Sequence, residues 1–127
     1  MGESIQSFRD LRVYQAACAL DEAIFRESKK WPCEEMYSLI DQVRRSSRSI
    51  GANIAESWAK RRYPAHFISK LSDADAELQE TMHWLGRANA YGYLADDRRS
   101  ALELECQSMG GMLGKIIREP EGFLLKT

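Results

Sequence analysis

The sequence predicts an all-α protein, an up-down-up-down bundle of four antiparallel helices. Three observations favour this fold. Apolar residues recur at helical spacing along most of the 127 residues, no segment alternates as a strand does, and the breaks between periodic segments are short. Hydrophobic residues make up 44% of the chain and charged residues 29%, as in a single globular domain with its own core. We therefore expect one domain over residues 1–127.

The first helix is predicted over residues 8–29. Four apolar residues lie on one of its faces: Val13, Ala17, Leu20 and Ile24. Ser7 and Asp10 stand three apart at its start, like a shortened capping box. Trp31-Pro32 ends it, because proline disfavours a helical conformation in the residue before it.

The second helix is predicted over residues 33–60, with Pro32 opening it and Glu34 and Glu35 at the positive end of its dipole. Its apolar stripe contains one serine: Met36, Leu39, Ile40, Val43, Ser47, Ile50, Ile54 and Trp58. A neighbouring strip is made mostly of small residues: Tyr37, Gly51, Ala52, Ala55 and Ala59. Apolar positions on two sides need more than one partner, so we expect this helix to pack on more than one side.

The third and fourth helices are predicted over residues 65–91 and 97–118, with a loose tail over 119–127. Gly92 is expected to end the third helix in a left-handed conformation, and Asp96 or Asp97 to cap the fourth. The fourth helix contains three glycines, each costing about 1 kcal/mol relative to alanine: Gly110, Gly111 and Gly114. Three glycines within five residues indicate a close backbone contact, a kink or a helix that frays early.

The charge is balanced overall but unevenly distributed. The net charge of −1 is unlike that of a dedicated nucleic-acid-binding protein, which is usually basic. Six basic residues nevertheless lie within nineteen positions: Arg44, Arg45, Arg48, Lys60, Arg61 and Arg62. Two interpretations stay open. These side chains contact the phosphates of RNA or DNA, or they form ion pairs with carboxylates of a neighbouring helix or subunit, for which Glu77 and Glu80 are candidates.

The cysteines indicate a reducing compartment. Cys18, Cys33 and Cys106 are odd in number and lack a C-x-x-C spacing, which argues against a disulfide framework. Cys106 falls on an apolar stripe and is interpreted as a core residue. We see no signal peptide and no apolar segment that approaches the roughly 20 residues of a membrane span. A cytoplasmic protein without a membrane partner is expected.

No catalytic residue, cofactor or metal site is predicted. A serine nucleophile needs a nearby base, and the two histidines, His66 and His83, are distant in sequence from the serine-rich segment. Glu80 and His83 form one Glu-x-x-His pair, but the second copy that a di-iron bundle needs is missing. Three polar residues are instead expected to be structural, with the serine hydroxyl bonded to a preceding carbonyl: Ser47, Asn53 and Glu77.

Five aromatic residues lie off the main apolar stripes: Tyr14, Phe25, Tyr37, Trp84 and Tyr91. Such residues stack on nucleic-acid bases or fill contacts between helices and subunits. We favour the second interpretation and expect them at an interface between copies of the chain.

The order of motifs resembles a known family. The motifs are FRDL and VYQ near the start, KWP and EEMYSL before the second helix, QVRRSSRSI and ANIAE within it, and AEL and GYL later. They are similar to those of the four-helix proteins encoded in intervening sequences of bacterial large-subunit ribosomal RNA genes, and of related accessory proteins of diversity-generating retroelements. The resemblance implies a left-handed bundle that assembles into a ring, typically a homopentamer, without a known catalytic residue. In the retroelement branch it implies binding of nucleic acid and a reverse transcriptase.

Together these observations predict a non-enzymatic, oligomeric scaffold or adaptor. Its first partner is itself, in a homo-oligomer for which the resemblance implies a pentamer. Weak contact with RNA or DNA through the basic residues is the second expectation. The alternative is a pure protein–protein interaction module whose arginines form ion pairs between subunits or with another protein.

Overall fold

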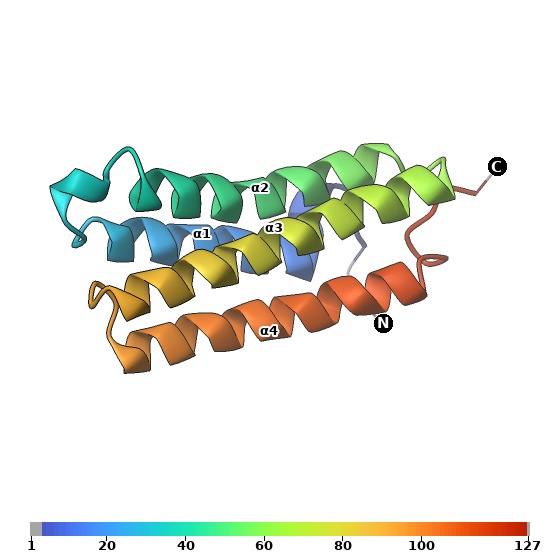
Figure 1. Ribbon diagram of the computed structural model, residues 1–127. Coiled ribbons are helices and arrows are strands. Elements are labelled where there is room, and N and C mark those ends of the chain that lie inside the picture. Colours follow the sequence, from blue (N-terminus) through green and yellow to red (C-terminus); the bar gives the residue numbers. More distant parts are fainter. Residues whose placement is uncertain (1–3, 127) are drawn as a thin grey trace.

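Four long helices pack as a bundle in the computed structural model, which describes residues 4–126 (Figure 1). They are α1 (Arg12–Ser28), α2 (Leu39–Ala59), α3 (Pro64–Ala90) and α4 (Asp96–Arg118). Two short 3-10 helices, η1 (Phe8–Asp10) and η2 (Cys33–Glu35), precede α1 and α2. Successive long helices run in opposite directions in Figure 1, so α2 and α4 are parallel and begin at the same end of the bundle.

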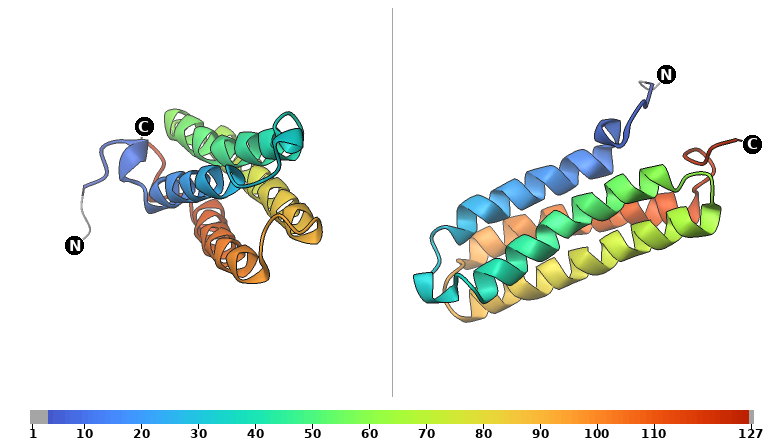
Figure 2. Two further views of the ribbon diagram at one scale, coloured as in Figure 1. Left: turned by 90° about the vertical axis from the view of Figure 1, so that its left-hand side faces the viewer. Right: turned by 90° about the horizontal axis from the view of Figure 1, so that it is seen from above.

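The end-on view in Figure 2 shows the helices at the corners of a rough square. Each helix packs against its two neighbours in the order α1, α2, α3, α4 and back to α1. The α2 and α4 helices therefore lie on a diagonal, and their outer faces point in opposite directions (Figure 2).

The core lies between the four helices and contains most of the residues that helical spacing placed on the inner stripes of the first two helices. Leu20, Ile50, Leu78 and Leu113 are fully buried, each from a different helix. Burying a side chain of this size stabilises the fold by about 1.5–3 kcal/mol. Cys106 is also fully buried, which confirms that it is a core residue.

The first helix is shorter than the expected range of 8–29. Ser7 and Asp10 do form a capping box, but on η1: the Ser7 hydroxyl accepts from the amide of Arg9, and the Asp10 carboxylate accepts from the amide of Ser7. Leu11 then takes an extended conformation (φ −71°, ψ 130°) and buries its side chain. The capping box closes a single turn, so α1 begins only at Arg12.

The second helix begins at Leu39, six residues later than expected. Pro32 precedes η2 and does not open α2. The Glu35 carboxylate accepts the Leu39 amide (3.4 Å) through one oxygen and the Tyr93 hydroxyl (2.9 Å) through the other. These bonds hold residues 33–38 outside the helix, and Met36, which was expected on the inner stripe, is exposed.

The connection between α3 and α4 differs from expectation in one respect. Gly92 has φ +82° and ends α3 in a left-handed conformation, as predicted. Neither Asp96 nor Asp97 caps α4, which starts after Ala95 without a side-chain cap. The Asp96 carboxylate instead accepts a hydrogen bond from the Asn89 side-chain amide (2.7 Å). This bond draws the aspartate toward α3 and away from the free amides of its own helix.

The helix α4 continues through its three glycines to Arg118. Within residues 4–126, no helix has both the length and the hydrophobicity required to cross a membrane.

Candidate functional site

One cluster of basic side chains surrounds an exposed aromatic ring on the outer side of α1 and α2. We call Phe25, Lys29, Arg44 and Arg48 the Phe25 cluster. The ring centroid of Phe25 lies 4.5 Å from Lys29 Nζ, 4.7 Å from Arg44 Cζ and 5.8 Å from Arg48 Cζ. Each such cation–π contact is worth about 0.5–1 kcal/mol at an exposed site. Three cations therefore share one ring.

The four members of the Phe25 cluster are not equally engaged. Arg44 donates through Nε to the Ser28 hydroxyl (2.8 Å) and through Nη2 to the Phe25 carbonyl (3.4 Å), which ties α2 to α1. Among the described residues, neither the Lys29 nor the Arg48 side chain has a hydrogen-bond or ion-pair partner. Burial and the Glu22 carboxylate raise the pKa of nearby Asp21, and Arg48 opposes that rise. The Asp21 carboxylate is therefore an acidic neighbour of Arg48, although the two form no ion pair.

Arg45 is directed to a different side of α2, toward α3. It forms ion pairs with Glu77 (3.9 Å) and with Glu80, whose carboxylate also accepts from Trp84 Nε1 (3.0 Å). The sequence identified both glutamates as partners of an arginine, and the structure places the pairs within one chain. One oxygen of Glu77 is buried and makes no hydrogen bond among the described residues, so Arg45 is its main electrostatic support.

The remaining basic residues lie at the far end of α2. The Arg61 guanidinium stacks 3.5 Å from the centroid of Trp58 and donates to the Trp58 carbonyl (2.8 Å), and burial lowers the pKa of Arg61. Lys60 and Arg62 are exposed. The six basic residues of the segment 44–62 thus fall into three separate places. Consecutive helical residues point about 100° apart, which sends Arg44 and Arg45 to different neighbours.

The five aromatic residues expected at an interface divide into two groups. Tyr14 and Trp84 are half-buried within the chain, where Tyr14 packs edge-on against Phe8 with ring centroids 4.9 Å apart. The other three rings are exposed, with 36% of Phe25, 95% of Tyr37 and 54% of Tyr91 accessible. These exposed rings are available to a partner.

The polar residues of α2 form hydrogen bonds within the helix and, at one point, with α3. The Ser47 hydroxyl donates to the Arg44 carbonyl (3.2 Å), which confirms the predicted bond, and the Asn53 amide donates to the Ser49 carbonyl (2.9 Å). Sequence reasoning missed a link between helices, in which the buried Thr81 hydroxyl donates to the Ser46 hydroxyl (2.9 Å). Because these two residues are 35 positions apart, no local pattern in the sequence indicates that their hydroxyls form a hydrogen bond.

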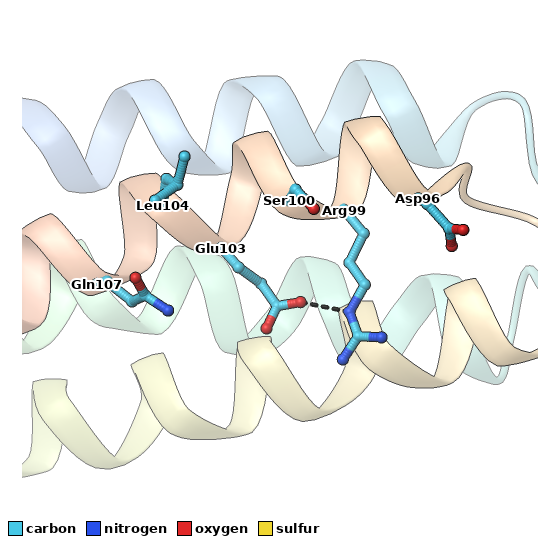
Figure 3. A pocket seen from close by; sticks show the side chains of 6 residues that line it. All are labelled: Asp96, Arg99, Ser100, Glu103, Leu104 and Gln107. Atoms are coloured by element: carbon cyan, nitrogen blue, oxygen red, sulfur yellow. Dashed lines mark hydrogen bonds and ion pairs between the residues drawn. The ribbon is translucent and has the colours of Figure 1, made fainter.

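Two shallow grooves lie on the surface. The larger, of about 500 Å³, follows the outer face of α4 and is lined by Asp96, Arg99, Ser100, Glu103, Leu104 and Gln107 (Figure 3). The smaller lies between the start of α2 and the end of α3, and its lining includes Glu35, Gln42, Trp84, Arg87 and Tyr91. Sequence reasoning overlooked Leu104, which is 65% exposed. Its position off the stripe of α4 was the available signal.

The residues described in the structure include no cluster of three or more metal-ligating side chains. His83 is exposed beside the Trp84 ring, and Glu80, its expected partner in the Glu-x-x-His pair, is engaged by Arg45 and Trp84.

Residues 9–115 match the model of the family described as 23S rRNA-intervening sequence protein. The chain belongs to this family. The match covers the four helices except the last residues of α4, so the residues that carry the Phe25 cluster and the α4 groove all lie inside it.

A solved structure is similar to this member of the family over most of its length. It is a protein of unknown function from the S23 ribosomal protein family of Bacteroides thetaiotaomicron VPI-5482. The two share 26% sequence identity and a TM-score of 0.75, with 84% of this chain and 95% of that chain covered. No protein with a curated description matches the sequence significantly.

Proposed function

We propose that this member of the 23S rRNA-intervening sequence protein family is a non-enzymatic scaffold that works by associating with further copies of itself. The assembly is a closed ring, and five copies is the size that the family resemblance implies.

The main support is the apolar surface that remains outside a complete core. The bundle closes around its inner stripes, yet large side chains stay exposed on several elements: Phe25, Met36, Tyr37, Tyr91 and Leu104. Aromatic residues and arginine are enriched at protein interfaces. An assembly of copies would cover these side chains, whereas a lone copy leaves them in water.

The hydrogen bonds and ion pairs of the arginines favour a role in protein contacts over a role in a continuous phosphate-binding strip. Arg44, Arg45 and Arg61 already have acceptors within the chain. A protein that follows a nucleic-acid backbone presents its basic side chains along one groove, and here they point to three places. The main role of Arg44 and Arg45 is therefore to connect α2 to its neighbouring helices.

Weak binding of RNA or DNA is a second candidate function, and one observation favours it. The Phe25 ring is exposed beside Lys29 and Arg48, which have no partner among the described residues. An aromatic ring next to free cations is an arrangement on which single-stranded bases stack.

The particle mass tests the scaffold proposal. Light scattering after size-exclusion chromatography should report a multiple of the 14.5 kDa chain at micromolar concentration. A stable 14.5 kDa particle would contradict self-association.

A salt titration with structured RNA tests the second candidate. If Lys29 and Arg48 contact phosphates, the logarithm of affinity falls with that of salt concentration with a slope of about −2. Arg48→Ala should reduce this slope by about 1, while Arg12→Ala, which removes an exposed arginine elsewhere on α1, should not. Equal effects of the two variants would indicate unspecific attraction and exclude a dedicated site at the cluster.

A further inference from the structure

The outer face of α4 is a helix surface without a partner inside the chain. Leu104 stands near its centre, and most of the exposed residues one or two turns away on this face are small, with Gln107 as the longer exception: Ser100, Ala101, Ser108 and Gly111. In Figure 3, Arg99 and Glu103 reach toward α3 whereas Leu104 points away from them. An alanine side chain at Gly111 would meet no atom within 4 Å. Such a face lets a second helix approach closely around one leucine.

The charges beside Leu104 complement those of the Phe25 cluster. Asp97 and Glu105 are exposed, and neither has an ion-pair partner among the described residues. Lys29 and Arg48 are likewise without an acceptor there. One copy therefore carries unpaired acids on α4 and unpaired bases on α2 and at the end of α1.

Leu104 and Arg48 lie at similar heights along the bundle, whereas Phe25, three residues before the last residue of α1, lies nearer to the end at which α2 and α4 start. Both α2 and α4 start at the end of the bundle drawn on the left of Figure 1. Leu104 is eight residues after the first residue of α4 and Arg48 is nine after the first residue of α2. At about 1.5 Å per residue these positions are ~12 Å and ~13 Å from that end. Copies placed side by side, without a shift along the bundle, bring Leu104 of one copy level with Arg48 of the other.

We propose that the outer face of α4 docks on the Phe25 cluster of a second copy. Leu104 packs on the Phe25 ring and on the aliphatic stem of Arg48, and Glu105 pairs with the Arg48 guanidinium. This inference rests on the proposed self-association and names the surfaces that perform it.

A second copy fits this face better than another kind of partner. The complementary charges belong to the same chain and lie on different helices, on the outer face of α4 and on the outer side of α1 and α2, so both surfaces remain accessible in every copy. Two unlike surfaces give a head-to-tail contact, which closes into a ring when the rotation between copies divides a full turn.

The experiment measures particle mass over a dilution series for the wild type, Leu104→Arg and Ala76→Arg. Ala76→Arg is the matched control, because it places the same side chain on an exposed position of α3. Circular dichroism monitors the fold, which Leu104→Arg should preserve since the leucine is exposed. We expect dissociation at a concentration at least about tenfold higher for Leu104→Arg than for the wild type and the control.

A charge exchange tests the pairing independently. Glu105→Arg and Arg48→Glu should each weaken assembly by about tenfold, and the double variant should return to within about threefold of the wild type. An oligomeric wild type whose Leu104→Arg variant stays assembled, or whose double variant is not restored, overturns this interface and leaves the scaffold proposal standing. A monomeric wild type overturns both.

Discussion

Replacing Gly110 with alanine should stabilise the protein. The glycine lies in the interior of α4, where alanine is more favourable by about 0.5–1 kcal/mol. An alanine Cβ at this position would lie 3.6 Å from Leu78 Cδ2 of α3, at ordinary van der Waals distance. The new methyl group therefore fills space between two helices without displacing either. We expect a gain of about 1 kcal/mol, or ~3–5 °C in the melting temperature of a domain of this size.

Gly92→Ala is the matched comparison and should have the opposite sign. Gly92 is in the left-handed region (φ +82°), where a side chain costs about 1–2 kcal/mol. Alanine also lowers the conformational entropy of the unfolded chain, which offsets about 0.4–1 kcal/mol of this cost. The net loss should be close to 1 kcal/mol, although no atom lies within 4 Å of the added methyl group.

Urea unfolding followed by circular dichroism measures both changes. Protein concentration must be the same for all variants, because self-association contributes to the apparent stability. A Gly110→Ala variant less stable than the wild type would refute the reasoning, since it would mean that α3 and α4 approach more closely at this point than 3.6 Å allows. A stabilised Gly92→Ala variant would refute the assigned left-handed turn.

Further predictions concern the thiols and the tie between α1 and α4. Burial raises the pKa of Cys106 to about 12, so its thiolate should be scarce at pH 8; a disulfide reagent should label exposed Cys33 in the native state and Cys106 only after unfolding. Arg98→Ala leaves the buried Glu27 carboxylate with only Lys30, at 4.0 Å, as an ion-pair partner. This variant should therefore lower the free energy of unfolding by about 1 kcal/mol more than Glu27→Gln does, as measured by thermal unfolding. Equal losses in these two variants would show that the buried charge does not need its partner.

Local patterns in the sequence were sufficient for the number and order of the helices. Most residues of the inner stripes predicted for the first two helices are buried, such as Leu20 and Ile54, whereas Met36 is exposed. Gly92 was also placed correctly, because a left-handed helix end depends on one residue. The start of the second helix was wrong by six residues. Its position depends on Tyr93, 58 residues beyond Glu35, and helical periodicity contains no information about that bond.

The candidate surfaces were less accessible to sequence reasoning than the fold. The sequence identified Arg44, Arg45 and Arg48 as a basic segment, yet the structure directs Arg45 to α3 and the other two to the Phe25 ring. Leu104 was overlooked because an exposed leucine is unremarkable until its neighbours in space are known.

By itself, the sequence determined an all-α chain with four helices and an inner apolar stripe on each, because those properties repeat every three to four residues along one segment. Only the tertiary structure decided which base meets which acid, where α2 begins and which faces stay uncovered. These depend on the rotation of each helix about its axis and on which side chains from distant segments the packing of the core brings within hydrogen-bonding distance.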